Sequence, residues 1–475
     1  MEVPYQLEKN TIYLVGAGCV NLITAYYLKR AGYDLTILDA TPSPFNCTWD
    51  RLGCTWGGED ARMFTLTEAD NYNQTSFPIG DESNRYFTRS IRDYGWDIRK
   101  IQQTELEKEW VNHHQEILPH QARLHEGSIL SFNAESKGLW EIMQAEDSEL
   151  FKDVEYHEGI IRLYSDTNHY QAQLARHTHR GSLIHNYPTP EELAIAHPSL
   201  SNAIASNNIA GGFKTIGFTV NAHKFLAKVI HWLELRDVSF HWNEKVERLH
   251  YNKSGKIVSL GTTERSLEGD NFILSLGAYG AELLQQTPAS GIICGVLGAW
   301  LTIPHLSPKL EYSLKLVRKG HVTEDANITI ATDKVGSPIL IIGSGYGFTG
   351  TSPHNIQLQM LELIYEGLRD TARIYFPEAY KQAVAMSALE CTQKYCIRPW
   401  TPSSLGIFET IPTSNGGKCI ITGGHNTGGF AQAPAVAKAV LASLIGTLHP
   451  MHTLYQDTGW KNAHREKLRP NNATR

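Results

Sequence analysis

The chain lacks the features that mark nucleic-acid-binding, membrane-spanning and metal-dependent proteins. It carries no stripe of lysine and arginine, and the formal net charge of its 475 residues is −6, which argues against a nucleic-acid partner. No apolar run approaches the length of a bilayer, so we expect no membrane span. None of the 21 histidines forms an H-x-x-x-H or H-E-x-x-H pattern, so we expect no metal site.

Cysteine is sparse and irregularly spaced. The seven cysteines are odd in number and contain no C-x-x-C pair, which is typical of a reduced compartment rather than of a disulfide framework. The first ten residues carry neither a basic nor an apolar segment, so no signal peptide is expected. These observations predict a cytoplasmic protein, and its 41% hydrophobic content is that of an ordinary globular chain.

The sequence does contain a glycine turn between an apolar strand and a helix near its beginning. The segment reads Thr11-Ile-Tyr-Leu-Val-Gly-Ala-Gly-Cys-Val-Asn21, and Asp39 ends the next apolar strand. Gly16 and Gly18 let the backbone approach a pyrophosphate at a helix N-terminus, and Asp39 is placed to bind a ribose hydroxyl. Asn21 replaces the third glycine of G-x-G-x-x-G. The alternative is an ordinary βαβ turn without a ligand.

The length of the chain predicts two closely joined domains. Periodic apolar residues indicate helices at 104–120, 139–149, 191–200, 221–235 and 355–376. Strands are expected at 238–241, 246–251, 256–260, 271–276, 295–304 and 337–344, and residues 156–164 are predicted as a strand pair turning at Gly159. The helix-rich stretch 75–155 is expected to be a packing extension, with a lid over the substrate as the alternative.

A second glycine-rich turn lies near the other end of the chain. A buried strand at 419–422 runs into Gly423-Gly-His-Asn-Thr-Gly-Gly429, and a helix is predicted at 434–445. Two such turns indicate one extended ligand held by both. A nicotinamide enzyme rarely needs the second turn, whereas a long flavin dinucleotide needs several backbone approaches. The glycine run at 343–350 is followed by no acid-ended strand, so we expect no separate NAD(P) site.

At this point the chain resembles the D-amino-acid oxidase superfamily of FAD enzymes, and most closely its D-amino-acid dehydrogenase and glycine-oxidase branches. The resemblance spans nearly the whole chain, and the order and spacing of its segments carry it. The segments are Val15-Gly-Ala-Gly18 with Asp39, Glu191-Glu-Leu-Ala-Ile-Ala-His-Pro198, Ala210-Gly-Gly212, Leu274-Ser-Leu-Gly-Ala-Tyr279, Gly298-Ala-Trp-Leu-Thr-Ile-Pro304, Arg398-Pro-Trp-Thr-Pro402 and Gly424-His-Asn-Thr-Gly428.

The resemblance implies an α/β fold of the glutathione-reductase-like, D-amino-acid-oxidase type. A Rossmann-type FAD-binding domain would be built from the separated segments 1–65, 200–290 and 380–463. An antiparallel-sheet substrate domain would comprise 66–199 and 291–379, and residues 464–475 would form a flexible tail.

The resemblance also implies contacts to FAD along its whole length. They are Gly16, Gly18 and Asp39 at the ADP half, Val246 at the adenine, Gly277 along the dinucleotide, and Gly424, His425 and Gly428 at the flavin end. Gly57 and Gly58 suit a further close backbone approach to the flavin. For Arg62, three partners stay open: the pyrophosphate, a second acid of the substrate, or Glu59.

The resemblance implies that Arg398 grips the carboxylate of a substrate. A planar guanidinium can bind a carboxylate through two parallel hydrogen bonds, which fixes orientation as well as charge. Its alternative is a surface arginine paired with an acid. Tyr346 and Trp300 are expected where the substrate domain faces the flavin, although aromatic residues there are as often part of a core.

Oxidation of an amine by flavin is hydride transfer from carbon to the flavin N5, so little is required of side chains and no catalytic base is assigned. We therefore expect an FAD-dependent enzyme that oxidises the C–N bond of an amino acid or amine. The imine would hydrolyse to an oxo acid, and the electrons would pass to oxygen or to a carrier.

Two other functions stay open. Cys396 matches the cysteine that attaches flavin covalently in the sarcosine-oxidase branch, which would favour a secondary-amine oxidase; the alternative is a small buried cysteine in place of glycine. A specialised biosynthetic amino-acid oxidase is a related possibility. The second functional class is a non-catalytic flavoprotein subunit, although the presence of Arg398 argues against it.

Overall fold

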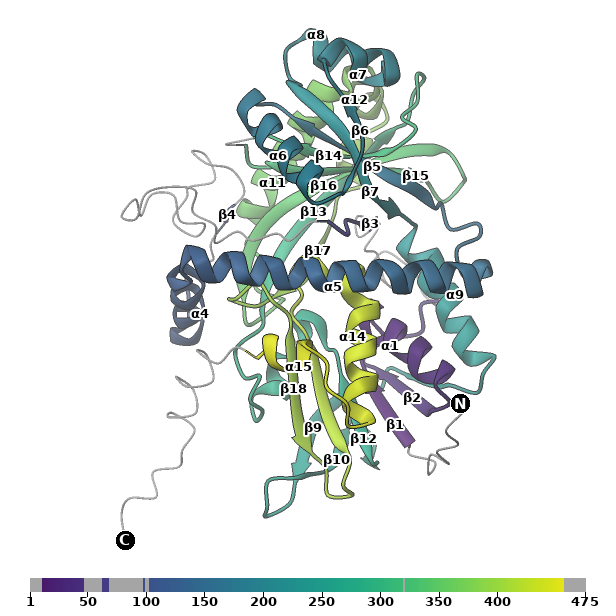
Figure 1. Ribbon diagram of the computed structural model, residues 1–475, viewed down its shortest axis with the longest axis vertical. Helices are drawn as coiled ribbons and strands as arrows, with labels where there is room; N and C mark the ends of the chain where they lie inside the picture. Colours follow the sequence, from purple (N-terminus) through teal and green to yellow (C-terminus); the bar gives the residue numbers. More distant parts are fainter. Residues whose placement is uncertain (1–10, 47–61, 68–96, 99–101, 319–320, 457–475) are drawn as a thin grey trace.

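The computed structural model describes residues 11–46, 62–67, 97–98, 102–318 and 321–456, and they form two large sheets with helices between and around them (Figure 1). The first sheet has six strands. Their order is β18 (Ile407–Pro412), β19 (Lys418–Gly423), β12 (Asn271–Leu274), β1 (Thr11–Val15), β2 (Asp34–Asp39) and β8 (Ser239–Trp242). All neighbours are parallel except β18, which runs antiparallel to β19.

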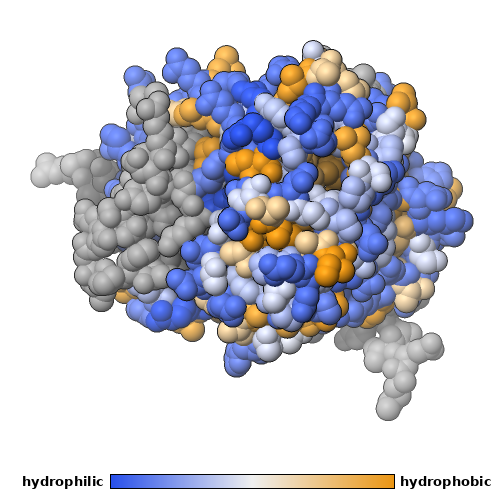
Figure 2. Space-filling model, turned by 90° about the horizontal axis from the view of Figure 1, so that it is seen from above, coloured by the Kyte–Doolittle hydropathy of each residue, from blue (hydrophilic) through white to orange (hydrophobic). Residues whose placement is uncertain are grey.

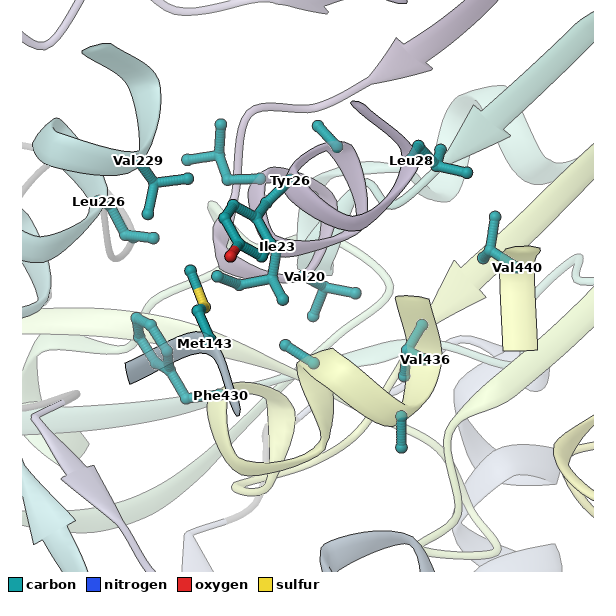
Figure 3. Close-up of a cluster of buried hydrophobic side chains, with 14 of the residues drawn as sticks. Val20, Ile23, Tyr26, Leu28, Met143, Leu226, Val229, Phe430, Val436 and Val440 are labelled. Atoms are coloured by element: carbon teal, nitrogen blue, oxygen red, sulfur yellow. The ribbon is translucent and has the colours of Figure 1, made fainter. Parts of the chain in front are cut away.

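One face of this sheet is covered by three helices. These are α1 (Cys19–Arg30), α9 (Ala222–Glu234) and α14 (Gly429–Leu444). Figure 3 shows side chains of all three pointing toward one another, among them Ile23, Leu226 and Val436. A strand buried on both faces reads as a continuous apolar run, which is why residues 12–15 and 271–274 lack polar alternation. A small sheet of β9 (Val246–Tyr251), β10 (Ile257–Thr262) and β11 (Ser266–Glu268) contributes to the core of the other face.

The second sheet has ten strands and is mostly antiparallel. Its main order is β17 (Lys394–Trp400), β13 (Cys294–Pro304), β16 (Pro338–Gly350), β15 (Asp325–Thr332), β14 (Ser313–Val317), β5 (His157–Tyr164), β7 (Gly211–Thr219) and β3 (Met63–Phe64), with β4 (Asp97–Ile98) on β16 and β6 (Leu183–Tyr187) on β7. Only the pairs β14–β5 and β16–β4 are parallel.

Alternation along β14 and β15 gives this part of the sheet one apolar face and one more polar face. On β14 and β15, Leu314, Leu316, Ala326 and Ile328 pack under α11 (Leu358–Tyr375) and α12 (Pro377–Ala385). The residues between them therefore face the opposite side, as the two-residue period of a strand requires. The remaining helices are α4 (Glu105–Glu116), α6 (Thr167–His179), α7 (Pro190–Ala196), α8 (Ser201–Ala205), α10 (Ala281–Leu284), α13 (Ala388–Cys391) and α15 (Met451–Leu454), with single 3-10 turns at Ser148–Leu150, Pro198–Leu200 and Gly277–Tyr279.

The long helix α5 (Pro119–Glu146) lies across the molecule between the two sheets (Figure 1). Its Trp140 Nε1 donates to the carbonyl oxygen of Ala431, and its Ser136 Oγ accepts from the Ala435 backbone N–H. Ala431 and Ala435 lie on either side of Pro434, whose backbone nitrogen has no hydrogen to donate within α14. On the other side, Glu126 pairs with Arg176 of α6 and with Arg180, the C-cap residue of that helix. Helix α5 therefore joins the two halves, as expected of a packing extension.

Several sequence predictions need correction. Residues 156–164 form the single strand β5, because Gly159, at φ +88°, makes an irregularity in the pairing with β7 rather than a turn. Strands β7 and β17 belong to the ten-stranded sheet, although 200–290 and 380–463 were assigned to the FAD-binding domain. Helix α5 packs on α14 although 66–199 was assigned to the substrate domain. Alternation shows that a strand has two faces but not which sheet it joins.

The surface seen in Figure 2 is mostly hydrophilic, with hydrophobic residues in separate small groups. Exposed apolar side chains include Ile184 and Ile195. Within the described ranges, no helix combines the length and the apolar character that crossing a bilayer requires. The described cysteines, which exclude Cys47 and Cys54, are all free thiols.

The carboxylate of Glu155 holds three segments together and gives a test of the fold. It accepts hydrogen bonds from Arg62 (2.5 Å), Lys224 (2.8 Å) and Thr332 (2.8 Å). Burial by itself would raise its pKa, but the Arg62 guanidinium and the hydrogen bonds outweigh burial and lower the pKa of Glu155 to about 2.

We expect Glu155→Gln to lower the free energy of unfolding by about 2 kcal/mol near neutral pH, because it removes the negative charge that pairs with the buried Arg62 guanidinium. A carboxylate with a depressed pKa contributes stability above its unfolded pKa of 4.5 and loses it as the pH falls toward 2. Urea unfolding should therefore give a constant difference from wild type above about pH 5.5 that shrinks below pH 4.5. Glu149→Gln, in the exposed pair with Lys152, is the control. A difference independent of pH would contradict the assignment.

Candidate active site

One cavity of about 950 Å³ is lined by loops at the carboxyl ends of the parallel strands and by the polar face of the ten-stranded sheet. Its volume lies in the upper part of the usual range of ligand pockets, about 300–1,000 Å³. The predicted residues that line it are Gly16, Gly18, Asp39, Val246, Gly277, Tyr346, Cys396, Arg398, Gly424 and His425. These residues come from both ends and the middle of the chain, and the fold brings them together around one cavity.

Hydrogen bonds from Asn21, which occupies the position of the third glycine, hold the opening turn in place. Asn21 is fully buried, and its Nδ2 donates to the carbonyl oxygens of Val15 and Gly16, each at 2.8 Å. Asp39 Oδ2 accepts from the backbone N–H of Ala17 at 2.6 Å. Gly16 adopts φ +95°, and a Cβ there would meet the carbonyl oxygen of Ser275. The loop is therefore fixed between β1, β2 and β12, with Asp39 at the cavity edge.

Open space lies beside two of the predicted glycines. A Cβ added to Gly18, the N-cap of α1, or to Gly277, at φ +58°, would meet no atom of the described residues within 4 Å. Helices α1 and α14 both begin at the cavity, where Cys19 and Gly429 line it. Their free N–H groups and dipoles favour a negatively charged ligand.

The histidine-bearing loop after β19 is paired with the end of β17. The backbone N–H of Asn426 donates to the carbonyl oxygen of Pro399 at 3.0 Å, and Asn426 Oδ1 accepts from the Thr401 N–H at 3.0 Å. His425 makes a bridge with Trp400. Burial lowers the pKa of His425 to about 4, so its imidazole is neutral at neutral pH.

Arg398 of β17 lies in the wall of the cavity, where neighbouring residues hold its guanidinium. Its Nη1 donates to the carbonyl oxygen of Gly345 at 3.0 Å, and its guanidinium lies 5.1 Å from the centre of the Tyr346 ring. Gly298 on the neighbouring strand β13 makes this placement possible, because a Cβ there would overlap the guanidinium. A carbonyl and an aromatic ring thus hold the fork in one orientation at the cavity wall.

Cys396 precedes Arg398 by two residues and so shares its face of β17. It lines the cavity and packs beside the cluster of Trp300, Ala331 and Ile341. Trp300 itself is 1% exposed and does not line the cavity, so the structure places it in the core. Of the two aromatic residues predicted for the substrate side, only Tyr346 reaches the cavity.

Other predicted residues lie elsewhere. Arg62 is buried and paired with Glu155, and it does not line the cavity. Gly428 is not a lining residue, although its neighbours Thr427 and Gly429 are. Gly57, Gly58 and the suggested partner Glu59 lie outside the described residues.

Sequence reasoning missed the residues that position the others. Asn21 was treated as a defect of the motif, although a buried amide at a tight turn signals a hydrogen-bonding role. Gly298 was quoted as part of a segment without a reason. Lys315, Asp325 and Asn327 also line the cavity, and their alternation with apolar residues along β14 and β15 was the available signal.

Comparison with known proteins agrees with this geometry. The model of the FAD dependent oxidoreductase family (DAO) matches residues 12–443. A D-amino acid dehydrogenase of Dechloromonas aromatica is 24% identical over 455 residues, covering 92% of this chain and 97% of the relative. Glycine oxidase from Bacillus cereus is similar in fold, with a TM-score of 0.61 at 13% identity over 94% of this chain and 97% of that one. Iminodiacetate oxidase from Chelativorans has the same TM-score at 14% identity, over 92% and 96% of the two chains.

The cavity fits the cofactor of this family. The open space beside Gly18 and Gly277, the two helix N-termini and the carboxylate of Asp39 are what a dinucleotide requires of its site. We infer that these groups hold the ADP half and the pyrophosphate of FAD, and that Gly424 and His425 lie at its flavin end. The predicted fold, family and cofactor are confirmed.

We expect Asn21→Ala to weaken FAD binding about tenfold, because two hydrogen bonds that hold the turn are lost. Titration of the apoprotein with FAD, followed by flavin fluorescence, measures this change. Tyr27→Phe is the control, since it removes a hydrogen bond to Leu139 from the same helix outside the cavity. Equal FAD affinity in Asn21→Ala and wild type would show that Asn21 does not support the turn.

Proposed function

The chain belongs to the family of FAD-dependent oxidoreductases, and from that premise we propose that it oxidises the C–N bond of an amino acid or a related amine. The product would be an imine that hydrolyses to an oxo acid and ammonia or a primary amine. The observation that carries the proposal is the position of Arg398 in the wall of the cofactor cavity. The relatives include a D-amino acid dehydrogenase and a glycine oxidase, which supports this substrate class.

Arg398 would bind the substrate carboxylate. Its backbone partner Gly345 and the Tyr346 ring hold the guanidinium at the wall, so the substrate would meet a preoriented fork rather than a flexible cation. Fixing the carboxylate restricts where the neighbouring carbon and its amine can lie. Orientation of this kind removes much of the entropic cost of bringing two reactants together.

FAD, when bound, supplies the acceptor for the hydride. The protein then needs to orient the substrate and to exclude water, and we assign no histidine base. Burial lowers the pKa of His425 to about 4, so its imidazole is a weak proton acceptor. We therefore propose that the substrate amine reacts in its neutral form and that its own deprotonation sets the pH dependence of the reaction.

The placement of Arg398 favours an enzyme over a non-catalytic flavoprotein. Gly298 and Gly345 both serve the placement of Arg398, and a subunit that only retained the cofactor would have no need of such a site. Flavin bleaching under anaerobic conditions separates the two functions. Failure of every amino acid and N-methyl amine to bleach the flavin would favour the non-catalytic subunit.

We expect Arg398→Lys to lower kcat/KM for amino acids about 100-fold while FAD binding is retained, because lysine cannot form two parallel hydrogen bonds. Gly298→Ala should also lower kcat/KM, through a higher KM, since the new methyl group displaces the guanidinium. Stopped-flow bleaching at several substrate concentrations measures both effects. Arg373→Lys, in an exposed ion pair on α11, is the control. Equal rates for amino acids and amines without a carboxylate would contradict the role of Arg398.

Cys396 provides a separate test of a sarcosine-oxidase-like activity. The thiol lies in the cavity wall but also packs beside the Trp300 cluster, as a small buried side chain would. We expect acid precipitation of the holoenzyme to release all the yellow colour into the supernatant. Colour that stays with wild type and is lost in Cys396→Ala would instead show a covalent flavin and favour the secondary-amine oxidase.

A further inference from the structure

Helix α4 begins at the wall of the cavity, and its first turn brings a buried carboxylate there. Glu107 is 1% exposed. Its Oε2 accepts from the backbone N–H of Thr104 at 2.8 Å, which completes a capping box at the start of α4. A carboxylate that only caps a helix can do so in contact with water, whereas burial of a charge is costly. The burial of Glu107 therefore indicates that it has a role beyond its own helix.

The other oxygen of Glu107 holds the loop 351–354, which follows β16. Oε1 accepts from the backbone N–H of Thr351 at 2.9 Å and from the Thr351 hydroxyl at 3.3 Å. Within the described ranges, the remaining hydrogen bonds of this loop are local ones, donated by the N–H groups of Asn355 and Ile356. Glu107 therefore provides the hydrogen bonds that tie the loop to another element.

Two glycines allow the first turn of α4 to lie this close to its neighbours. A Cβ at Gly350, the last residue of β16, would overlap the Glu107 carboxylate. A Cβ at Gly291 would meet the Leu106 side chain at 2.8 Å, and both of these residues line the cavity. One turn further along the helix, Trp110 is fully buried, and its Nε1 donates at 2.9 Å to the carbonyl oxygen of the residue after Gly291. The start of α4 is thus fixed against the cavity wall.

The loop 351–354 forms part of the mouth of the cavity. All four of its residues line the cavity, and Ser352 and His354 are also exposed to solvent. The His354 ring meets the Tyr279 ring edge to face, with 6.0 Å between the ring centres. Tyr279, which is 42% exposed, lines the cavity as well and belongs to the turn that begins at Gly277. Because a residue that borders both cavity and solvent lies at an opening, His354 and Tyr279 stand at the entrance.

We propose that Glu107 is a positioning residue, which acts through the loop 351–354 to hold His354 against Tyr279 and to keep this side of the mouth narrow. Bound FAD would thereby be shielded from water where it passes Gly277, and exclusion of water strengthens the electrostatic interactions within a site. This inference uses the cofactor of the family and does not depend on the proposed oxidation of an amine.

Four variants separate the loop contact from the capping of α4. Glu107→Leu removes both acceptor oxygens at a similar side-chain volume, and Glu107→Gln retains one neutral acceptor oxygen. Thr104→Ala removes the hydroxyl that caps α4 but leaves the Glu107 carboxylate in place. Because loss of this cap also lowers stability, Thr104→Ala controls for destabilisation alone. Glu105→Gln, in the exposed pair with Lys108, is the surface control.

Hydrogen exchange of the FAD-bound protein measures whether the loop is held. In Glu107→Leu, the Thr351 amide should exchange about tenfold faster, because it loses a hydrogen bond to a charged group. Quenching of the bound flavin's fluorescence by acrylamide, a neutral probe, should increase as well. Glu107→Gln should lie between wild type and Glu107→Leu in both measurements, whereas Thr104→Ala and Glu105→Gln should match wild type.

Two results would overturn the inference. One is unchanged exchange and quenching in Glu107→Leu. The other is an equal change in Thr104→Ala, which would show that Glu107 only caps α4. If Glu107→Leu does not retain FAD, the comparison of Glu107→Gln with Thr104→Ala decides in the same way. Neither measurement needs a substrate, so failure of every amino acid to bleach the flavin would overturn the proposed function and leave this inference intact.

Discussion

The cavity depends on the pairing between the end of β17 and the loop that follows β19. Two hydrogen bonds join Asn426 to Pro399 and Thr401, and His425 forms a bridge with Trp400. This contact links the sheet that carries Arg398 to the sheet whose glycine turns line the cavity. Because β17 pairs with β13 and its end bridges to the loop after β19, the position of Arg398 is fixed relative to the glycine turns. A loosely joined pair of domains would not keep it, since interfaces within a chain commonly allow movement.

Helix α5 supports the same junction from outside. It bonds to the backbone of α14 on both sides of Pro434 and reaches α6 through Glu126. Its far end is held as well, because Asp147 accepts from the Tyr26 hydroxyl at 2.5 Å and from Trp232 Nε1 at 3.0 Å. The helix therefore stiffens the arrangement that β17 and the histidine loop establish, and it does so without lining the cavity.

Features that depend on local sequence pattern could be predicted from the sequence. Features that depend on contacts between distant residues could not. The first strand, helix and acid were predictable because a glycine turn, a 3.6-residue period and Asp39 occur at fixed spacing. The sheet to which β7 and β17 belong was not predictable, because a strand shows the same alternation of apolar and polar residues in either sheet. The role of Gly298 was equally hidden, since its reason is a side chain about a hundred residues away. The burial of Trp300 could not be predicted either, because a buried aromatic residue and a pocket residue look alike in sequence.

The two ends of the cavity differ in charge, and this difference gives the site a direction. The charged residues of the described lining are Asp39, Glu244, Glu247 and Glu282 with Lys245 at the end near Val246, and Arg398 and Lys315 with Asp325 at the other, so acidic residues predominate at one end and basic residues at the other. Glu244 is tied to Arg265, whose hydrogen bonds hold the pKa of Glu244 below its usual value. Carboxylates suit the hydroxyls of a ribose, whereas cations suit a carboxylate substrate. Between them, the N-termini of α1 and α14 favour the pyrophosphate. This direction would favour one orientation of FAD, with its ribose at the acidic end, and the proposed carboxylate substrate would bind at the opposite end.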